Sequence, residues 1–227
     1  MASALAAIQA LEPGETFDPA VPAALVASGL HLLCLPESVG GLGAGMATAV
    51  DVLAALGAVD GSTGLGFAMH LHVSGALADS TGWRPDLLAW LEDLVVHDGA
   101  LLNAASTEDG SGSPSRGGLP ATQAVAVDGG YRVTGEKTWT TWLPALRAVL
   151  VTAVIRPGDE VGIFVVDLAE AGVERSTTFD ALGMRGSASG RLRLRDVFVP
   201  AERLVTVRRP GLPDPRGVAP PAWFGAT

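Results

Sequence analysis

Two segments of the sequence carry residue types that could bind a bulky, partly anionic ligand. The first, residues 107–113, reads TEDGSGS and follows an apolar stretch at 101–105. Small residues there let backbone N–H groups approach a ligand closely, while Thr107, Ser111 and Ser113 supply hydroxyl groups. An ordinary surface turn explains the same residues, and on this segment alone the turn is the better interpretation.

The second segment, residues 135–142, reads GEKTWTTW. Its two indole rings, Trp139 and Trp142, stand among three Thr hydroxyls, and such a group could wall a planar heterocycle and hydrogen-bond to its edge. The alternative is a core strand in which a Trp has β-branched neighbours, which strand propensity explains without a ligand. The sequence contains no GxGxxG, GxxxxGK[ST] or GxSxG motif, so it supports no Rossmann site, P-loop or hydrolase elbow.

Other reactive residue types are sparse. Cys34 is the single cysteine and lies in the apolar run at 32–35, so we expect a small buried side chain, and an internal disulfide is excluded. His70 and His72 are two residues apart on an expected helix, where their side chains point in different directions and make a poor metal pair. We therefore expect no metal site and structural roles for both histidines, with contact of one of them to a substrate as the alternative.

Composition and charge narrow the function classes. The chain has 227 residues, 48% hydrophobic and 17% charged, with a net charge of -9, and its mean hydropathy is +0.35. Lys137 is the only lysine and no basic stripe is present, so nucleic acid is not an expected partner. No apolar stretch reaches the roughly 18 residues of a membrane span, and the N-terminus lacks a signal-peptide pattern, so we expect a cytoplasmic protein with no membrane partner.

The N-terminal half has the pattern of a helical domain. Apolar residues recur with the helical period up to His97, and Gly, Pro and Asp residues interrupt them. Asp18 and Pro19 form a helix start with Asp as N-cap, and residues 60–63 end one helix and cap the next. Helices are expected over 1–11, 18–29, around 47–56, over 64–78 and from 84 through 94.

After Gly99 the apolar residues alternate or form short runs, which predicts strands. A hairpin turn is expected at 128–130. Helices followed by strands indicate an α+β fold, with an N-terminal all-helical domain and a middle domain built as a β-barrel or sandwich. The expected strands lie at 124–127, 131–134, 148–155, 161–168 and 191–199. The expected domains are residues 1–98, residues 99–209, and a connector at 210–227 that opens a further, missing domain.

The two candidate segments occur in a defined order with other landmarks. TExGxGS at 107–113 is followed, after roughly two dozen residues, by GxKxWxT at 135–141. A Leu-Pro-Glu loop with several glycines precedes them at 35–43, and LGMRGS at 182–187 and DVFVP at 196–200 follow. This order of motifs resembles the acyl-CoA dehydrogenase family. No single motif is decisive, but several in the same order are quite specific.

The resemblance covers most of the chain and implies a fold and a cofactor. In that family an N-terminal helical domain precedes a β-barrel-like middle domain and a C-terminal helical domain, and FAD lies between the last two, usually at a subunit interface. By this resemblance, Ser106 and Thr107 would contact the pyrimidine side of the flavin, and Gly112 and Ser113 would lie beside its pyrophosphate.

The same resemblance assigns the second segment to the flavin ring. Trp139 would pack against the ring system, and Thr140 and Thr141 would approach it, with Thr141 nearest the reactive nitrogen. A hydrogen bond donated there would favour the reduced flavin as charge develops. The implied cofactor-binding set is Ser106, Thr107, Gly112, Ser113, Trp139, Thr140 and Thr141.

Departures from the family pattern affect the expected activity. The family usually has an aliphatic residue at the position of Thr140, Asn at Trp142 and Pro at Asp109. In dehydrogenase members the catalytic base is a Glu of the C-terminal helical domain, which lies outside these 227 residues. No catalytic residue is therefore assigned within this chain, and Glu108 is expected to be structural.

The resemblance implies a flavoprotein oxidoreductase of fatty-acid metabolism that dehydrogenates an acyl-CoA thioester at its α and β carbons. A small-molecule substrate, an electron acceptor like electron-transfer flavoprotein, and a homodimer or homotetramer are the implied partners. Two alternatives stay open: a flavin-dependent monooxygenase of the same fold, and a non-catalytic relative that serves in binding or interaction.

Overall fold

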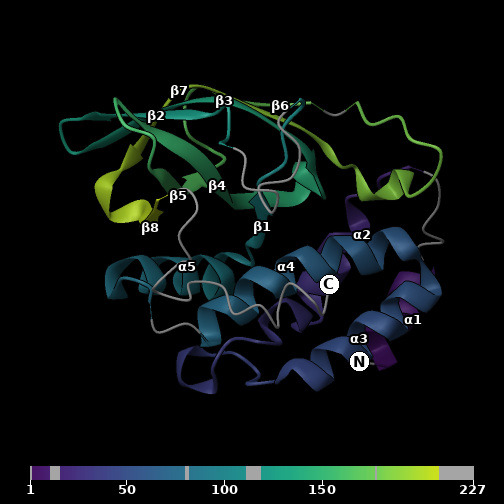
Figure 1. Cartoon of the computed structure of the whole chain (residues 1–227). Helices are drawn as coiled ribbons and strands as arrows, with labels where there is room; N and C mark the ends of the chain where they lie inside the picture. The colour runs from purple at the N-terminus through teal and green to yellow at the C-terminus, as the bar shows by residue number, and fades with distance from the viewer. Residues whose placement is uncertain (1, 11–15, 80–81, 111–118, 177, 210–227) are drawn as a thin grey trace.

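A layer of helices lies against a folded β-sheet (Figure 1). The helices occupy the first part of the chain and the strands the second, so the α+β fold class predicted from the change of hydrophobic period is confirmed. The computed structural model describes residues 2–10, 16–79, 82–110, 119–176 and 178–209.

The helical layer is built around α4, which is buried along nearly its whole length. The helix itself carries apolar and small residues on all its faces, which is the pattern of a helix enclosed by the rest of the fold. α3 packs beside it, and β1 of the sheet contacts it from above. The α-helices in the described residues are α1 (Ala2–Ala10), α2 (Ala20–Ala27), α3 (Met46–Val59), α4 (Gly61–Asp79) and α5 (Pro85–Asp98).

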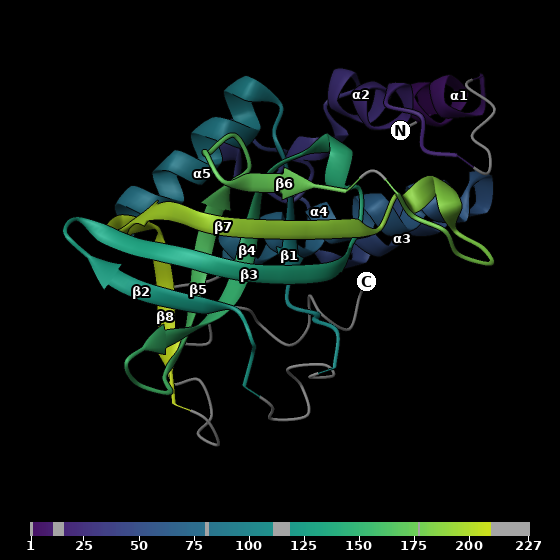
Figure 2. The same cartoon turned by 90° about the horizontal axis from the view of Figure 1, so that it is seen from above.

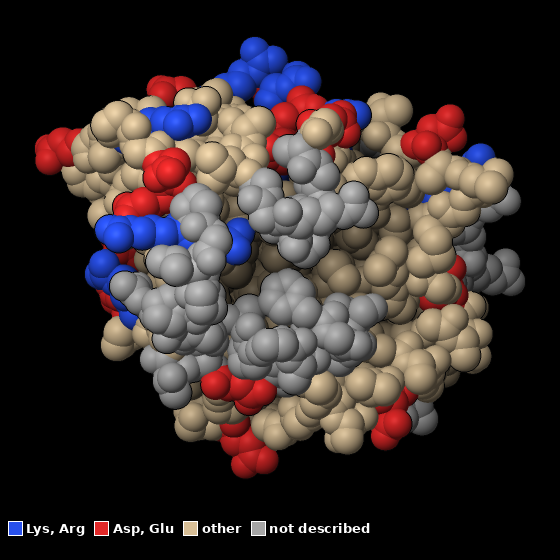
Figure 3. Space-filling view, in the orientation of Figure 1, with Lys and Arg blue, Asp and Glu red and all other residues tan. Residues whose placement is uncertain are grey.

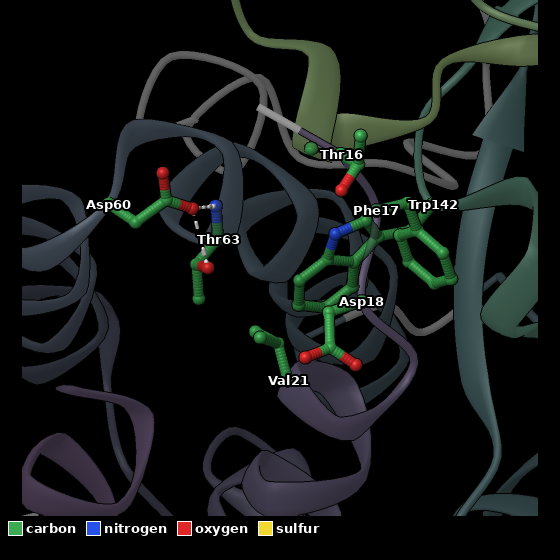
Figure 4. A pocket seen from close by; sticks show the side chains of 8 residues that line it. Thr16, Phe17, Asp18, Val21, Asp60, Thr63 and Trp142 are labelled. Atoms are coloured by element: carbon green, nitrogen blue, oxygen red, sulfur yellow. Dashed lines mark hydrogen bonds between the residues drawn. The ribbon is translucent and has the colours of Figure 1, made fainter. Parts of the chain in front are cut away.

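The helix ends follow from local hydrogen bonds. Helix α2 begins at Ala20 with Pro19 as its N-cap, one residue later than predicted, so the prediction of Asp18 as N-cap is wrong. The carboxylate of Asp18 nevertheless accepts the backbone N–H of Ala20 at 2.8 Å. Asp60 separates α3 from α4 as predicted, because its Oδ2 accepts both the N–H and the hydroxyl of Thr63, at 2.6 and 2.7 Å (Figure 4). Such caps satisfy backbone donors that a helix leaves unpaired.

The strands form one mixed sheet in the order β6-β7-β3-β2-β4-β5-β8, with β1 paired in parallel to β4. The predicted hairpin turn joins β2 to β3, and Gly129 within it has a φ of 75°, which favours glycine. The strands are β1 (Leu101–Ala105), β2 (Gln123–Val127), β3 (Gly130–Thr140), β4 (Leu146–Arg156), β5 (Val161–Asp167), β6 (Val173–Arg175), β7 (Gly190–Pro200) and β8 (Leu204–Arg208).

The sheet folds over on itself, so that β6, β7, β3 and β2 cross above β1, β4, β5 and β8 (Figure 2). The sheet bends between β2 and β4, which pair in parallel over only three residues. Apolar side chains between the two halves form the core of this part, including Val133, Val149, Phe164 and Leu194. This arrangement is the sandwich-like packing expected for the second half of the chain.

A buried histidine joins the helices to the sheet. The backbone N–H of Leu102 in β1 donates to Nδ1 of His70 at 3.2 Å, so Nε2 carries the proton and donates to the carbonyl of His31 at 2.8 Å. His70 is fully buried, and burial lowers its pKa to about 4. Both ring nitrogens are used, so the alternative of a substrate contact finds no support for His70.

Two predictions about domain organisation are not tested by these helices and strands. The connector at 210–227 lies outside the described residues, and the division at residues 98 and 209 stays a prediction. Among the described residues, the helices are too short or too polar to cross a membrane.

Candidate functional site

Strand β3 carries a β-bulge within the segment that the sequence analysis singled out. The pairing of β3 with β7 shifts between Lys137 and Thr140, and Trp139 between them has a φ of 58°. The bulge breaks the alternation, so Lys137, Thr138 and Thr140 are buried while Trp139 is 61% exposed. The alternative of a core Trp at this position is therefore wrong.

An open hollow of about 190 Å³ lies beside Trp139. The ring of Trp139 meets the ring of Phe179 edge to face, with centroids 5.8 Å apart. Thr138, Ser189 and Arg191 also line the hollow. Aromatic surface combined with a few polar groups is typical of sites for flat, polar ligands.

Buried hydroxyls without partners lie on both sides of Trp139. The described residues contain four buried side-chain polar atoms without a hydrogen-bond partner, and two of them are Oγ1 of Thr138 and Oγ1 of Thr140. Leaving such a group unsatisfied costs about 1–3 kcal/mol, so each one calls for an explanation. Thr138 lines the hollow, while its Oγ1 is itself buried, so a ligand in the hollow would contact this hydroxyl only after a local shift of the bulge.

A chain of three buried hydroxyls reaches the same hollow. Ser187 Oγ lies 2.8 Å from Ser189 Oγ, which lies 3.1 Å from Oγ1 of Thr141. The backbone at both ends is held in place: the side-chain amide of Asn103 donates to the carbonyl of Thr141 at 2.9 Å, and the N–H of Trp142 donates to the carbonyl of Ser187 at 2.7 Å. The hydroxyls thus sit on a rigid support.

Unfavourable backbone conformations gather around this chain. Of the five described non-glycine residues with positive φ, four flank it: Trp139, Trp142, Met184 and Ala188, with φ of 58°, 57°, 58° and 41°. A left-handed conformation costs a residue with a side chain roughly 1–2 kcal/mol. Such strain persists where the surroundings enforce it and is concentrated at functional sites.

Glu108 and Lys137 form a buried ion pair beneath this region. The Glu108 carboxylate also accepts the hydroxyl of Thr122 at 2.6 Å and the backbone N–H of Ala121 at 2.5 Å, and Lys137 donates to the hydroxyl of Thr152 at 3.2 Å. Burial opposes ionisation of Glu108, but the bonds from Lys137 and Thr122 outweigh it and hold the pKa below its ordinary value. The predicted structural role of Glu108 agrees with this geometry.

Trp142 packs inside the protein and does not line the hollow. It is 1% exposed, and a Cβ added to Gly66 of α4 would lie 2.0 Å from its ring, so only glycine fits there. Figure 4 shows the indole beside Phe17 and Asp18, next to a cavity of about 10 Å³, which has room for no more than a water molecule. Trp142 is thus a packing residue.

Of the seven predicted flavin-contacting residues, five lie in the described part of the chain and two lie outside it. The N–H of Thr138 donates to the carbonyl of Thr107 at 2.8 Å, so the end of β1 that carries Ser106 and Thr107 lies against the bulge of β3. The structure therefore brings Thr107 against the bulge, while Thr140 and Thr141 are buried and, unlike Trp139, do not line the hollow. Gly112 and Ser113 lie outside the described residues.

Sequence reasoning counted Thr138 among the three Thr hydroxyls of its segment but left it out of the cofactor-binding set, and it missed Ser187 and Ser189. Thr138 stood within the GxKxWxT motif at a position that strand alternation points outward, and only the bulge turns it inward. Ser187 closes the LGMRGS motif, and Ser189 follows it by two residues, but nothing in the sequence indicates that they meet Thr141, 48 positions before Ser189.

Other reactive groups are accounted for by the fold. Cys34 is buried, and burial raises the pKa of its thiol to about 12, as expected for a packing residue. The described residues hold no cluster of three or more metal-ligating side chains. On the face shown in Figure 3, Arg side chains lie close to Asp and Glu side chains, and this face carries no broad basic area.

Comparisons with known proteins agree with this architecture. Two family models match the chain: the N-terminal domain of acyl-CoA dehydrogenase over residues 3–82, and the middle domain of acyl-CoA dehydrogenase over residues 103–197. The chain is 36% identical over 197 residues to YdbM of Bacillus subtilis, an acyl-CoA dehydrogenase homologue, covering 87% of this chain and 50% of YdbM. The chain thus spans about half the length of the curated relatives it matches.

Solved structures show the same fold. TdsC from Paenibacillus sp. A11-2, a dibenzothiophene monooxygenase crystallised with FMN and indole, superposes with a TM-score of 0.79 at 25% identity, covering 92% of this chain and 52% of TdsC. An acyl-CoA dehydrogenase from Bacillus anthracis in complex with FAD superposes with a TM-score of 0.72 at 25% identity, covering 82% of this chain and 32% of that protein. By its matched helical and sheet regions, this chain belongs to the acyl-CoA dehydrogenase family.

Proposed function

We propose that this chain is the flavin-binding part of an FAD-dependent oxidoreductase, with the flavin ring in the hollow beside Trp139. The observation that carries the proposal is one bulge that combines an exposed indole with buried hydroxyls that lack a protein partner. Relatives in complex with FMN and FAD share the fold and support it.

The residues at the hollow suit the cofactor. A flavin ring has a flat apolar face and a row of polar atoms along one edge. Trp139 offers an exposed indole surface for the face, and Ser189, which lines the hollow, offers a hydroxyl for the edge. Thr140 and Thr141 are buried and do not line the hollow, and we propose that they approach the edge of the ring when it binds. Ser106 and Thr107 would contact the ring from β1, and Gly112 and Ser113 remain the proposed contacts to the pyrophosphate.

Bound FAD would supply the hydride-accepting chemistry that dehydrogenation of an acyl-CoA thioester requires. The part of this chain is to bind and orient the ring, to donate hydrogen bonds to its edge and to keep water from its buried side. Neither carboxylate of the hollow suits the base, because Asp109 lies 2.6 Å from Arg191 and Asp180 is exposed and 3.9 Å from Arg185. The base is proposed to come from outside the described residues.

A flavin-dependent monooxygenase is the second candidate. The likeness to TdsC favours it. In either case we propose a small-molecule substrate and a homodimer or homotetramer, and for the dehydrogenase an acceptor like electron-transfer flavoprotein.

The visible absorption spectrum of the purified protein tests the proposal. A bound flavin whose absorption bleaches anaerobically on addition of acyl-CoA supports the dehydrogenase. A flavin that binds in the reduced form and does not respond to acyl-CoA supports the monooxygenase. A protein that takes up flavin in neither redox state would contradict both and favour a non-catalytic role.

A further inference from the structure

The three-hydroxyl chain of Ser187, Ser189 and Thr141 contains one proton more than its hydrogen bonds use. Each hydroxyl has one proton to donate and lone pairs that accept. The two contacts, at 2.8 and 3.1 Å, need one donor each. One O–H is therefore left over, whichever way the bonds point.

The remaining O–H has three places to be. If both bonds point from Ser187 toward Thr141, Thr141 carries it. If both end residues donate to Ser189, Ser189 carries it. If both bonds point the other way, Ser187 carries it. The described part of the chain offers none of these hydroxyls another side-chain or backbone acceptor.

The position of the hollow decides among these arrangements. Ser187 is 1% exposed and does not line the hollow, so a spare proton there would be buried without an acceptor, which is costly. Ser189 lines the hollow beside Thr138, and it is bonded directly to Thr141. Thr141 does not line the hollow either, so the favoured arrangement is the one in which Ser187 and Thr141 both donate to Ser189, and a ligand in the hollow accepts the proton of Ser189. The hydrogen bonds that Ser189 accepts strengthen its own donation.

We infer that Ser189, oriented by its hydrogen bonds with Ser187 and Thr141, presents its O–H to an acceptor on the edge of a bound flavin ring, and that Ser187 is a positioning residue for it. The inference rests on the proposed function and adds the roles of these two serines to it. The backbone supports the arrangement, because Met184 and Ala188, on either side of Ser187, are both held in the left-handed conformation. The donor is thus set before the ligand arrives.

A matched set of variants tests this role. Ser189→Ala removes the link between Ser187 and Thr141, and Ser189→Thr keeps a hydroxyl at the same place. Ser74→Ala is the control, because Ser74 is also buried and its hydroxyl donates to the carbonyl of His70, at 3.0 Å. The midpoint potential of bound FAD is measured by anaerobic reductive titration, together with the dissociation constant of oxidised FAD.

We expect Ser189→Ala to shift the midpoint potential to a more negative value. The shift should correspond to a loss of about fivefold or more in the preference for reduced over oxidised flavin, the size of one lost hydrogen bond. Ser189→Thr should restore the wild-type potential, and Ser74→Ala should not change it. Ser187→Ala should shift the potential in the same direction by a smaller factor, and it serves as the second variant if Ser189→Ala does not fold.

Two failures are distinguishable. If wild-type protein binds no FAD, the proposed function falls, and this inference falls with it. If wild-type protein binds FAD and both Ser189→Ala and Ser187→Ala, or the one of them that folds, keep its midpoint potential, the flavin site stands and the inferred role of these serines is wrong.

Discussion

Two buried polar clusters lie a few residues apart on β3, and they differ in how completely they are satisfied. Around Lys137, the ion pair with Glu108 is surrounded by donors and acceptors from Thr122, Thr152 and the backbone. Around Trp139, the hydroxyls of Thr138 and Thr140 have no partner within the described part of the chain. One strand thus carries a closed network and, after a bulge, an open one.

The difference separates holding the fold from binding a ligand. A buried network in which every group is paired makes the core unique and leaves no capacity for a further partner. Unpaired buried donors beside a hollow are costly in the free protein, and they become favourable only when a ligand supplies acceptors. The comparison predicts that substitutions in the first cluster change stability, and that those in the second change binding.

The largest expected effect is on the closed network. Glu108→Gln or Lys137→Met breaks the buried pair and leaves its partner charged without compensation, which should lower the free energy of unfolding by about 3–5 kcal/mol. Urea denaturation followed by circular dichroism measures it. A loss below about 1 kcal/mol in both variants would mean that the pair is not the closed network described here.

The next effect concerns His70, whose two ring hydrogen bonds, to Leu102 and His31, can both form only when the ring is neutral. Its pKa of about 4 lies below the ordinary 6.5, so the unfolded chain binds the proton more readily between these pH values, and stability falls as pH drops from 6.5 toward 4. This pKa difference of about 2.5 corresponds to a loss of roughly 3 kcal/mol in the free energy of unfolding across that pH range.

Urea denaturation at several pH values measures this dependence, and His70→Gln isolates it. His31 and His72 are also buried with lowered pKa values and add to the slope, so the comparison with the variant is essential. Equal slopes for wild type and His70→Gln between pH 6.5 and 4.5 would contradict the assignment.

A smaller effect is expected for Trp139→Ala in the open cluster. Because the side chain is 61% exposed, its loss should change the free energy of unfolding by less than about 0.5 kcal/mol. An aromatic contact with a flavin ring contributes about 0.5–1.5 kcal/mol beyond burial, so the dissociation constant of FAD should rise roughly tenfold. Trp90→Ala, on the far helix α5, is the control and should leave FAD binding unchanged.

The smallest effect is expected for Thr140→Val. The hydroxyl has no partner, so replacing it by a methyl of similar shape should leave stability unchanged or raise it by up to about 1 kcal/mol. Thr206→Val in β8 removes an equally orphaned hydroxyl and should behave alike in denaturation. FAD affinity should fall severalfold only for Thr140→Val, and an equal response of both variants would remove Thr140 from the site.

The sequence predicted those parts of the fold that depend on local patterns. The cap at Asp60 and the hairpin turn at Gly129 each follow from residue types within a few positions, and the structure contains both. The helix predicted to start after Asp18 is also present, but it begins one residue later, with Pro19 as its N-cap. The change from helical to strand periodicity near residue 99 is also local. The family resemblance supplied the flavin interpretation of residues 106–107 and 139–141, which periodicity alone could not.

What the sequence did not predict depends on long-range pairing. The bulge at Trp139 arises from a register shift against β7, so alternation along β3 alone misplaces Thr138 and the indole. The meeting of Ser189 with Thr141 brings together residues 48 positions apart. Trp142, expected beside a ligand, is instead buried against Gly66 of α4, a contact that no local pattern indicates.

The most direct test of the account asks where the flavin lies. The chain contains five Trp residues, so protein labelled with ¹⁵N at the indole nitrogens gives few signals, and Trp139→Phe identifies the one from Trp139. Titration with FAD should move the Trp139 signal strongly and leave the buried Trp142 signal nearly in place. Flavin binding that perturbs Trp142 or Trp90 while Trp139 stays unchanged would contradict the placement of the ring beside the bulge of β3.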